Sequence, residues 1–317
     1  MKHFTSTLGA MLAAAVLAAP TTTLAGPLIG VSVNGNHTYD TYADLWTNVT
    51  DSGLSSGINP NATLPYTTEL RTQTVVGTMS NSTTGSIVTP AGLNSTFEIS
   101  KIARYQQQVI EQTGNSIHFG LPVAQDAAMD VDLLHTGVQN VAIYFDRLGA
   151  NAGSKAVPGN GANTVRCYGA GATSAGCGGG GDSDGDGTLI MSGHLIFNEA
   201  TFTRNGAVGT GSFSTSFMID YVDANYLDVV TGSIIDDNFT GTTNLPSFFN
   251  PVRTWDGMQP DGSFPFFKVD SSQSFAPAAV PEPATLALFG LGLAGLALAE
   301  RRKIKGKVEA MVRVAAC

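Results

Sequence analysis

Basic residues are few in this chain. Only 13% of its residues are charged, and 16 Lys and Arg stand against 25 Asp and Glu. Between Pro27 and Val280 the imbalance is 9 against 22, which gives a net charge of −13. A protein that binds nucleic acid through phosphate contacts needs clustered Lys and Arg. The composition therefore excludes a nucleic-acid-binding protein of that kind.

The local signatures of common enzyme classes are also missing. There is no Gly-x-Ser-x-Gly elbow, no His-Glu-x-x-His helix and no phosphate-binding Gly-Lys-Ser/Thr loop. The five histidines are scattered. We expect His37, His118, His135 and His194 to be ordinary sheet or turn residues. The sequence therefore predicts a protein that is not an enzyme.

Carboxylate pairs leave one enzymatic alternative open. Glycosidases use two Asp or Glu side chains, and Asp130 with Asp132, or Asp236 with Asp237, are candidates for such a pair. Adjacent or alternate Asp residues are more often solvated side chains at strand ends, and we predict that these four are of that kind. A secreted hydrolase that acts on polysaccharide remains the alternative.

Cysteine is scarce as well, with three residues in 317. Cys167 and Cys177 would close a ring of 11 residues, and a disulfide there would stabilise the fold by about 2 to 3 kcal/mol. A zinc site is the weaker interpretation, because no second pair of Cys or His stands at ligand spacing. Cys317 lies beyond the apolar segment described below, so we expect a lone cytoplasmic thiol.

A glycine-rich acidic stretch contains a partial calcium motif. Residues 182–189 (DSDGDGTL) match the first eight positions of a calcium loop. The candidate ligands are Asp182, Asp184, Asp186 and Thr188. Position twelve is Gly193 in place of the usual bidentate Glu, so calcium would bind weakly unless Glu199 or Asp220 supplied a carboxylate. The alternative is a flexible acidic surface loop, and the sequence indicates no other cofactor.

The N-terminus, residues 1–25, is predicted to be a signal peptide. A basic start precedes an apolar run at residues 8–19, and small residues ending at Ala25 suit a signal peptidase. The run is too short to span roughly 30 Å of hydrocarbon as a mature helix. We therefore expect a chain that begins at Gly26 and is exported to a compartment where disulfides persist.

One apolar segment stands near the other end of the chain. Residues 284–299 carry no charge and would be about 24 Å long as a single helix, which spans a membrane only marginally. A Pro/Ala linker, residues 276–283, precedes them, and its prolines prevent the helix from extending upstream. The basic tail, residues 300–317, would stay in the cytoplasm. This order favours a transmembrane helix over a buried core helix.

These C-terminal features resemble the PEP-CTERM sorting signal of exported bacterial proteins. The residues that carry the resemblance are Pro281, Glu282 and Pro283, the apolar span, and the basic residues Arg301, Arg302 and Lys303. It covers about 25 of the 317 residues. The resemblance implies that an exosortase, a membrane protease, recognises the Pro-Glu-Pro motif and removes the tail. It further implies transient anchoring in the inner membrane, then delivery to the cell surface or the exterior, and an association with exopolysaccharide and biofilm.

The intervening segment, residues 26–275, is predicted to be an all-β domain. Short stretches rich in Val, Ile, Phe, Tyr and Thr are bounded by Gly, Asn and Asp. The expected strands are 138–145, 188–197, 211–221 and 226–235. Their spacing favours an antiparallel β-sandwich or a jelly-roll-like fold.

Two finer predictions concern individual segments. Alternate residues of the third expected strand are larger and share one face: Phe213, Thr215, Phe217, Ile219 and Tyr221. The best helix candidate is 99–112, where apolar residues recur three to four apart, although a pair of strands fits nearly as well.

Two functions are consistent with these observations. The first is a structural or adhesive protein of the cell surface or matrix, which binds exopolysaccharide through an acidic surface rich in Thr and Asn, with calcium as a bridge. The second is the secreted hydrolase. Trp46 and Trp255 are candidates for stacking on sugar rings, although core packing is the more common fate of tryptophan.

Overall fold

The computed structural model describes residues 28–48, 51–59, 61–132, 134–147, 188–205, 208–243 and 266–276. The chain divides into two compact units, Met1–Ala276 and Pro277–Cys317, and the described residues all belong to the first. The strands are β1 (Ile29–Val31), β2 (Thr41–Ala43), β3 (Leu45–Asn48), β4 (Asp51–Ser56), β5 (Tyr66–Asn81), β6 (Ser86–Ile87), β7 (Phe97–Thr113), β8 (Ser116–Gly120), β9 (Val141–Arg147), β10 (Thr188–Asn205), β11 (Val208–Val222), β12 (Leu227–Asp228), β13 (Ile234–Thr242) and β14 (Phe266–Ala276). A single 3-10 turn, η1 (Ala127–Met129), is the one helical element among the described residues.

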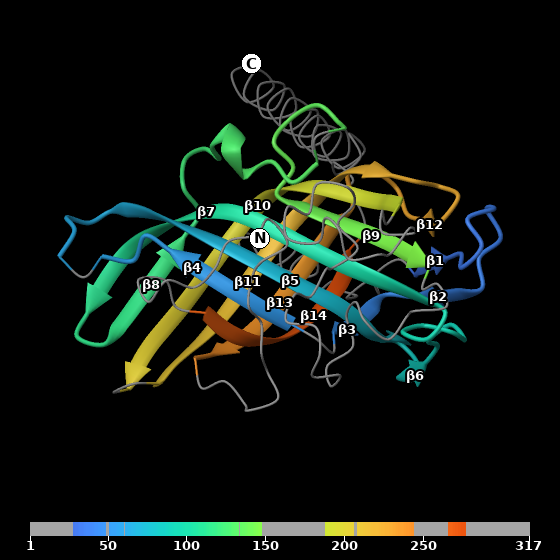
Figure 1. Cartoon of the computed structure of the whole chain (residues 1–317), viewed down its shortest axis with the longest axis horizontal. Coiled ribbons are helices and arrows are strands. Elements are labelled where there is room, and N and C mark those ends of the chain that lie inside the picture. Colours follow the sequence, from blue (N-terminus) through green and yellow to red (C-terminus); the bar gives the residue numbers. More distant parts are fainter. Residues whose placement is uncertain are drawn as a thin grey trace, which may run out of the picture. The chain divides into compact units, whose positions relative to one another are not determined.

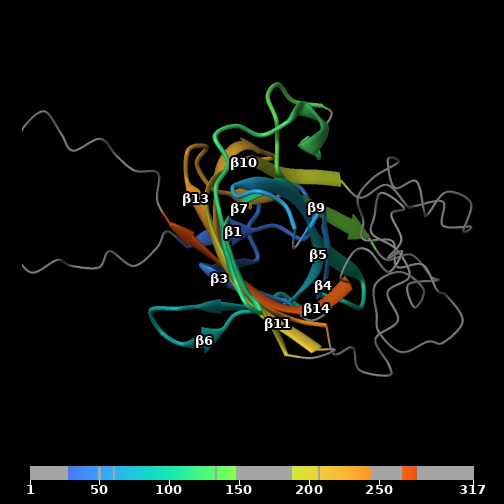
Figure 2. The same cartoon turned by 90° about the vertical axis from the view of Figure 1, so that its left-hand side faces the viewer.

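Most of these strands form one antiparallel sheet that closes on itself (Figures 1 and 2). The sheet runs in the order β3-β5-β4-β14-β13-β11-β10-β8-β7-β9, and β5 also pairs with β7, which joins the two sides of the sheet into a ring. A second, three-stranded sheet has the order β12-β1-β2. The predicted all-β antiparallel fold is confirmed.

Two apolar clusters fill the ring. One cluster joins side chains from strands all around the ring, including Trp46, Ile99, Ile235 and Phe275, and it continues into the small sheet. The other includes Leu70, Tyr105, Phe217 and Phe239. Because side chains from every wall meet in these clusters, the residues in them point inward. Burial of this apolar surface is the main force that holds the ring closed.

The helix candidate at 99–112 is wrong, and the strand alternative is closer, because these residues lie within one strand, β7. Alternate side chains of this strand, Ala103, Tyr105, Gln107 and Val109, are buried in the ring. The residues that suggested a helix recur at three- and four-residue intervals, but the alternation of two is the pattern that burial follows.

The alternation predicted for 211–221 holds until a bulge near its end. Phe213, Phe217 and Ile219 are buried inside the ring. Gly193 pairs with Ile219, but its neighbour Ser192 pairs with Tyr221, so β11 carries one extra residue at this point. A bulge of this kind changes the face on which the following side chains lie. Tyr221 therefore packs with an outer group of residues instead of the interior.

The other expected strands differ mainly at their ends. The stretches 138–145 and 188–197 correspond to β9 and β10, each displaced or extended by several residues. The stretch 226–235 is not one strand, because a turn at Gly232, with φ of 85°, separates β12 from β13. Glycine adopts this backbone conformation without the steric cost that other residues incur.

Several predicted segments lie outside the described residues. They are the signal peptide, the linker, the segment 284–299 and the basic tail. Within the part of the chain that the structure describes, no helix is long and apolar enough to cross a membrane.

Candidate functional site

A cleft of ≈ 830 Å³ opens on the outer side of the ring, next to β10 and β11. Its walls come from these two strands and from the segment that precedes β9, residues 134–140. The side chains that matter most for its chemistry are His135, Gln139, Asn140, His194, Asp220 and Tyr221. Residues far apart in the sequence thus meet at one surface.

Asp132 fixes the segment 134–140 against β10. Its carboxylate is 1% exposed and accepts hydrogen bonds from the Leu134 backbone N–H at 2.9 Å and from Ser192 Oγ at 2.6 Å. His135 Nδ1 lies 2.7 Å from the same carboxylate. An ionised carboxylate only accepts, so Nδ1 of His135 carries the hydrogen. In the neutral ring Nε2 is then an acceptor.

A second imidazole is held in the same way. Nδ1 of His194, on β10, lies 2.6 Å from Asp220 Oδ2 on β11. Asp220 is the residue that the register skips between Ile219 and Tyr221, so the bulge brings its carboxylate to the cleft. Nε2 of His194 is again the free acceptor of the neutral ring.

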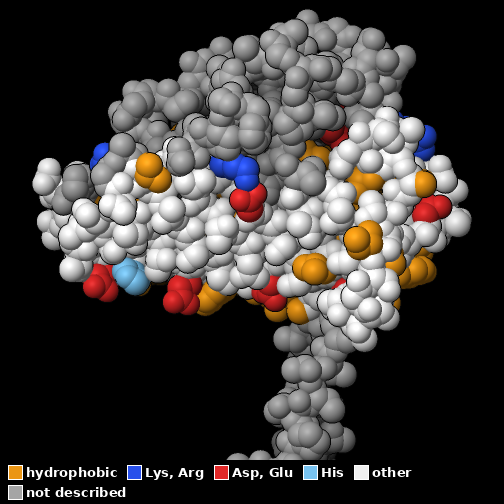
Figure 3. Space-filling model, turned by 90° about the horizontal axis from the view of Figure 1, so that it is seen from below, with side chains coloured by type: hydrophobic (Ala, Val, Ile, Leu, Met, Phe, Trp, Pro, Cys, Tyr) orange, Lys and Arg blue, Asp and Glu red, His pale blue; other side chains and the backbone are white. Residues whose placement is uncertain are grey.

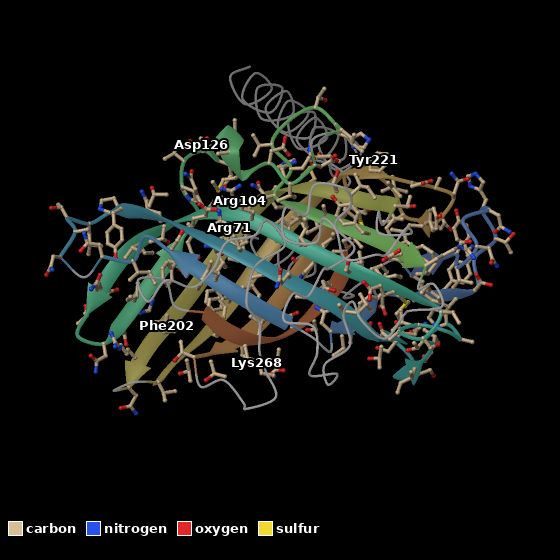
Figure 4. All side chains as sticks on the ribbon, in the orientation of Figure 1. Arg71, Arg104, Asp126, Phe202, Tyr221 and Lys268 are labelled. Carbon is tan, nitrogen blue, oxygen red and sulfur yellow. The ribbon has the colours of Figure 1, made fainter. Side chains whose placement is uncertain are left out.

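Tyr221 forms the aromatic wall of the cleft. Its ring stacks on His135, with centroids 3.8 Å apart and an interplanar angle of 25°. Burial, followed by the charges of Asp223 and Asp132, raises the pKa of Tyr221, so the hydroxyl stays protonated at neutral pH. Figure 4 shows Tyr221 and Phe202 toward opposite ends of the β10–β11 pair.

This arrangement differs from the usual hydrolytic and metal centres. In a serine hydrolase the histidine lies between the serine and the acid. Here Asp132 lies between Ser192 and His135, so no imidazole is placed to accept the Ser192 proton. No group of three or more His, Cys, Asp or Glu among the described residues is placed to hold a metal ion.

A second outer surface, which we call the polar face, crosses five strands. The cross-strand register aligns one row of side chains on it: Glu199, Ser214, Asn238, Ser272 and Thr47. A neighbouring row contains Thr201, Ser212, Thr240 and Asp270. All nine line a shallow groove of ≈ 680 Å³. Among the described residues visible in Figure 3, uncharged polar side chains and backbone cover most of the surface.

The structure separates one of the two candidate carboxylate pairs, Asp236 and Asp237. Asp236 faces outward and accepts from Ser216 Oγ, whereas Asp237 is buried in the ring beside Lys101. Neighbouring residues of a strand point to opposite faces, so these two acids cannot act on one bond. Asp130 accepts the backbone N–H groups of Asp132 and Gln139 and thereby shapes the loop.

The remaining candidates are placed only in part. Trp46 is fully buried and packs on Phe275, with ring centroids 4.8 Å apart, so it does not stack on a ligand. Thr188 begins β10, and Glu199 lies eleven residues along the same strand, about 36 Å away at 3.3 Å per residue. Glu199 therefore lies far from Thr188, the one candidate ligand of the calcium loop that the structure describes.

The other predicted site residues lie outside the described part of the chain. These are Asp182, Asp184, Asp186, Cys167, Cys177, Trp255, Pro281, Glu282, Pro283, Arg301, Arg302 and Lys303. The calcium loop and the disulfide therefore stay predictions.

Sequence reasoning missed the two imidazole–carboxylate pairs. His135 and Asp132 are three residues apart, which is a local signal, but His194 and Asp220 are separated by 26 positions. The contact of Ser192 with Asp132 spans 60 positions. Only the pairing of β9, β10 and β11 brings these groups together.

The fold and the terminal motif together define an all-β exported protein. Residues 279–303 match the model of the PEP-CTERM protein-sorting motif. The chain thus carries this sorting motif, as Pro281, Glu282, Pro283 and the basic residues after the apolar span predicted. Proteins with the motif are exported, processed by an exosortase and associated with the membrane or the cell surface. Comparisons with curated proteins and with solved structures give no match.

Proposed function

We propose that the β domain is a non-enzymatic protein of the cell surface or extracellular matrix that binds exopolysaccharide. Before processing it is held in the inner membrane by the segment 284–299, and an exosortase then acts at the Pro-Glu-Pro motif. The observation that carries the binding role is the polar face, with its rows of hydroxyl, amide and carboxylate groups across five strands.

The geometry of the polar face suits a long, hydroxylated ligand. Neighbouring strands lie about 4.8 Å apart, and side chains on one face repeat about every 6.8 Å along a strand. A polymer that crosses the strands thus meets a donor or an acceptor at each of them. Hydroxyl and amide groups can replace their hydrogen bonds to water with hydrogen bonds to a sugar. The net desolvation cost of this exchange is small.

Rigidity supports the same interpretation. The side chains of the polar face stand on strands whose opposite faces are buried, and Thr201 Oγ1 lies 3.0 Å from Ser212 Oγ. Groups that are ordered before binding lose less conformational entropy when a ligand arrives. Weak contacts repeated along a polymer then add up to firm retention.

The test uses the full chain in detergent and polysaccharide extracted from the matrix of the producing cells. We expect the protein to be retained on the polymer without release of reducing ends. Asn238→Ala, in the centre of the first row, is expected to weaken retention. Asn61→Ala, the same change at an exposed turn, is the control and is expected to have no effect.

Two results would contradict the proposal. Release of reducing ends would favour the alternative function, a hydrolase that acts on polysaccharide. Failure of the wild-type chain to be retained on the polymer would remove the binding role itself.

A further inference from the structure

The cleft beside Tyr221 has a composition unlike that of the polar face. None of the described residues that line it is Lys or Arg, whereas Asp220 contributes a carboxylate that is one third exposed. Its two imidazoles are 33% and 40% exposed. The exposed part of the Asp220 carboxylate is thus open to a ligand, and no described Lys or Arg of the lining competes for it.

The tautomers of both histidines are fixed by their carboxylate partners. Nδ1 of His135 bonds to Asp132, and Nδ1 of His194 bonds to Asp220, so each neutral ring presents Nε2 as an acceptor. Asp132 cannot turn away, because it also holds Ser192 Oγ and the Leu134 backbone N–H. Residues of the protein thus fix the orientation of both imidazole rings before a ligand binds.

The amide donors around the cleft are already engaged. Asn140 Nδ2 donates to the Arg104 carbonyl at 3.1 Å, and its Oδ1 accepts from the Leu195 backbone N–H. Gln125 makes both of its side-chain bonds with the backbone of Gln106. Asp220 is the described carboxylate that lines the cleft, and it can only accept, so a suitable ligand must bring a donor to it.

We propose that this cleft binds a sugar unit that carries a primary ammonium group, an amino sugar of the exopolysaccharide. An ammonium has only donors, which suits the Asp220 carboxylate, an acceptor that is one third exposed. Tyr221 and His135, stacked on each other, add aromatic surface to the lining of the cleft, which suits the apolar face of a sugar ring and attracts a nearby cation. This inference rests on the proposed function, because it assumes that the ligand is a saccharide. It adds a second binding site, which is specific for amino sugars.

The experiment measures binding of three probes to the full chain in detergent, at neutral pH and with a chelator present. The probes are a glucosamine oligosaccharide, the fully N-acetylated oligosaccharide of equal length, and an oligolysine of equal charge. Acetylation removes the charge and keeps the ring, whereas oligolysine keeps the charge and lacks the ring. We expect the glucosamine oligosaccharide to bind at least about tenfold more tightly than either of the others.

Substitutions then assign the binding to the cleft. Asp220→Asn keeps the shape and removes the charge, and we expect affinity for the glucosamine oligosaccharide to fall about tenfold. Asp220→Glu is expected to restore most of that affinity. Asp228→Asn, an exposed acid on β12, removes an equal charge elsewhere and is expected to bind like the wild type. Thermal unfolding of each variant separates lost affinity from lost fold.

Several outcomes would overturn the inference. They are equal affinity for acetylated and free amino oligosaccharides, equal affinity for oligolysine, or undiminished binding by a folded Asp220→Asn variant. If the chain is retained on matrix polysaccharide but ignores the glucosamine oligosaccharide, the amino-sugar site is wrong and the proposed function stands. If the chain binds neither the matrix polysaccharide nor the glucosamine oligosaccharide, the amino-sugar site and the proposed function are both wrong.

Discussion

Lys101 and Asp237 form an ion pair in the interior of the ring. Lys101 Nζ lies 2.5 Å from Asp237 Oδ2, and the two side chains are 1% and 2% exposed. Gln273 Nε2 donates to the other carboxylate oxygen at 3.3 Å. The pair lies between the two apolar clusters, since Ile99 and Ala103 flank Lys101 along β7 and belong to one cluster each.

Removal of one partner of this pair should destabilise the domain strongly. Lys101→Met leaves the buried Asp237 carboxylate without its counter-charge, and such changes cost about 3 to 5 kcal/mol. Urea unfolding of the full chain in detergent measures the free energy. The double variant Lys101→Met/Asp237→Leu removes both charges and should recover most of the loss. A single variant as stable as the wild type would show that the pair contributes little.

Tyr144 makes the stability of the domain depend on pH in alkaline solution. Burial, and then the charge of Asp132, raises its pKa from 10.0 to about 12. The neutral phenol is thus favoured in the folded state. Its contribution to stability is complete below pH 10 and is lost as the pH rises from 10 through about 12, by about 2 to 3 kcal/mol in total.

Tyr144→Phe removes this titration. Between about pH 9 and about pH 11.5, the variant should lose less unfolding free energy than the wild type. Tyr105, whose pKa is also raised by burial, keeps its own contribution in both proteins, so the comparison isolates Tyr144. Equal losses in the two proteins would show that the Tyr144 phenol titrates alike in the folded and unfolded chains.

The bulge between β10 and β11 depends on a glycine. A Cβ on Gly193 would lie 2.2 Å from the backbone oxygen of Met218, which cannot move without disturbing the ladder. Gly193→Ala should therefore cost about 1 to 3 kcal/mol and displace Asp220 and Tyr221 from the cleft. In Gly120→Ala the new Cβ meets only the Ile110 side chain at 3.6 Å, so this control should be close to neutral.

Thermal unfolding and amino-sugar binding check the two effects of Gly193→Ala. If Gly193→Ala unfolds at the same temperature as Gly120→Ala, the bulge tolerates a side chain, contrary to our expectation.

The strands were predictable where β-branched and aromatic residues concentrate, as in β9, or where large residues alternate, as in β11. The helix at 99–112 was wrong, because a strand with polar residues such as Lys101 and Gln107 on its buried face does not show plain alternation. Lys101 can face inward because its ion-pair partner, Asp237, lies on another strand, β13. Sequence pattern within one segment cannot reveal such a partner.

The closed ring and the cleft could not be predicted for the same reason, because both depend on pairing between distant parts of the sequence. The pairing of β5 with β7, which closes the ring, joins Leu70 to Tyr105, and the cleft joins Asp132 to Ser192. By contrast, the sorting motif is contiguous in sequence, which is why it was recognisable without the structure.

The whole molecule combines a closed domain with a removable tail. A ring of paired strands leaves few free strand edges, which limits edge-to-edge association of copies that are concentrated at a surface. The sorting motif stands after Ala276, the last residue of β14, so processing at Pro-Glu-Pro removes no described strand. We therefore expect the released domain to keep its fold.

The most direct test is the mass of the protein recovered outside living cells. We predict a chain that starts at Gly26 and carries no peptide from residues 284–317, because both ends are removed during export. Intact-mass measurement and peptide sequencing report both ends together. Recovery of extracellular protein that still carries residues 284–317 would contradict processing by an exosortase.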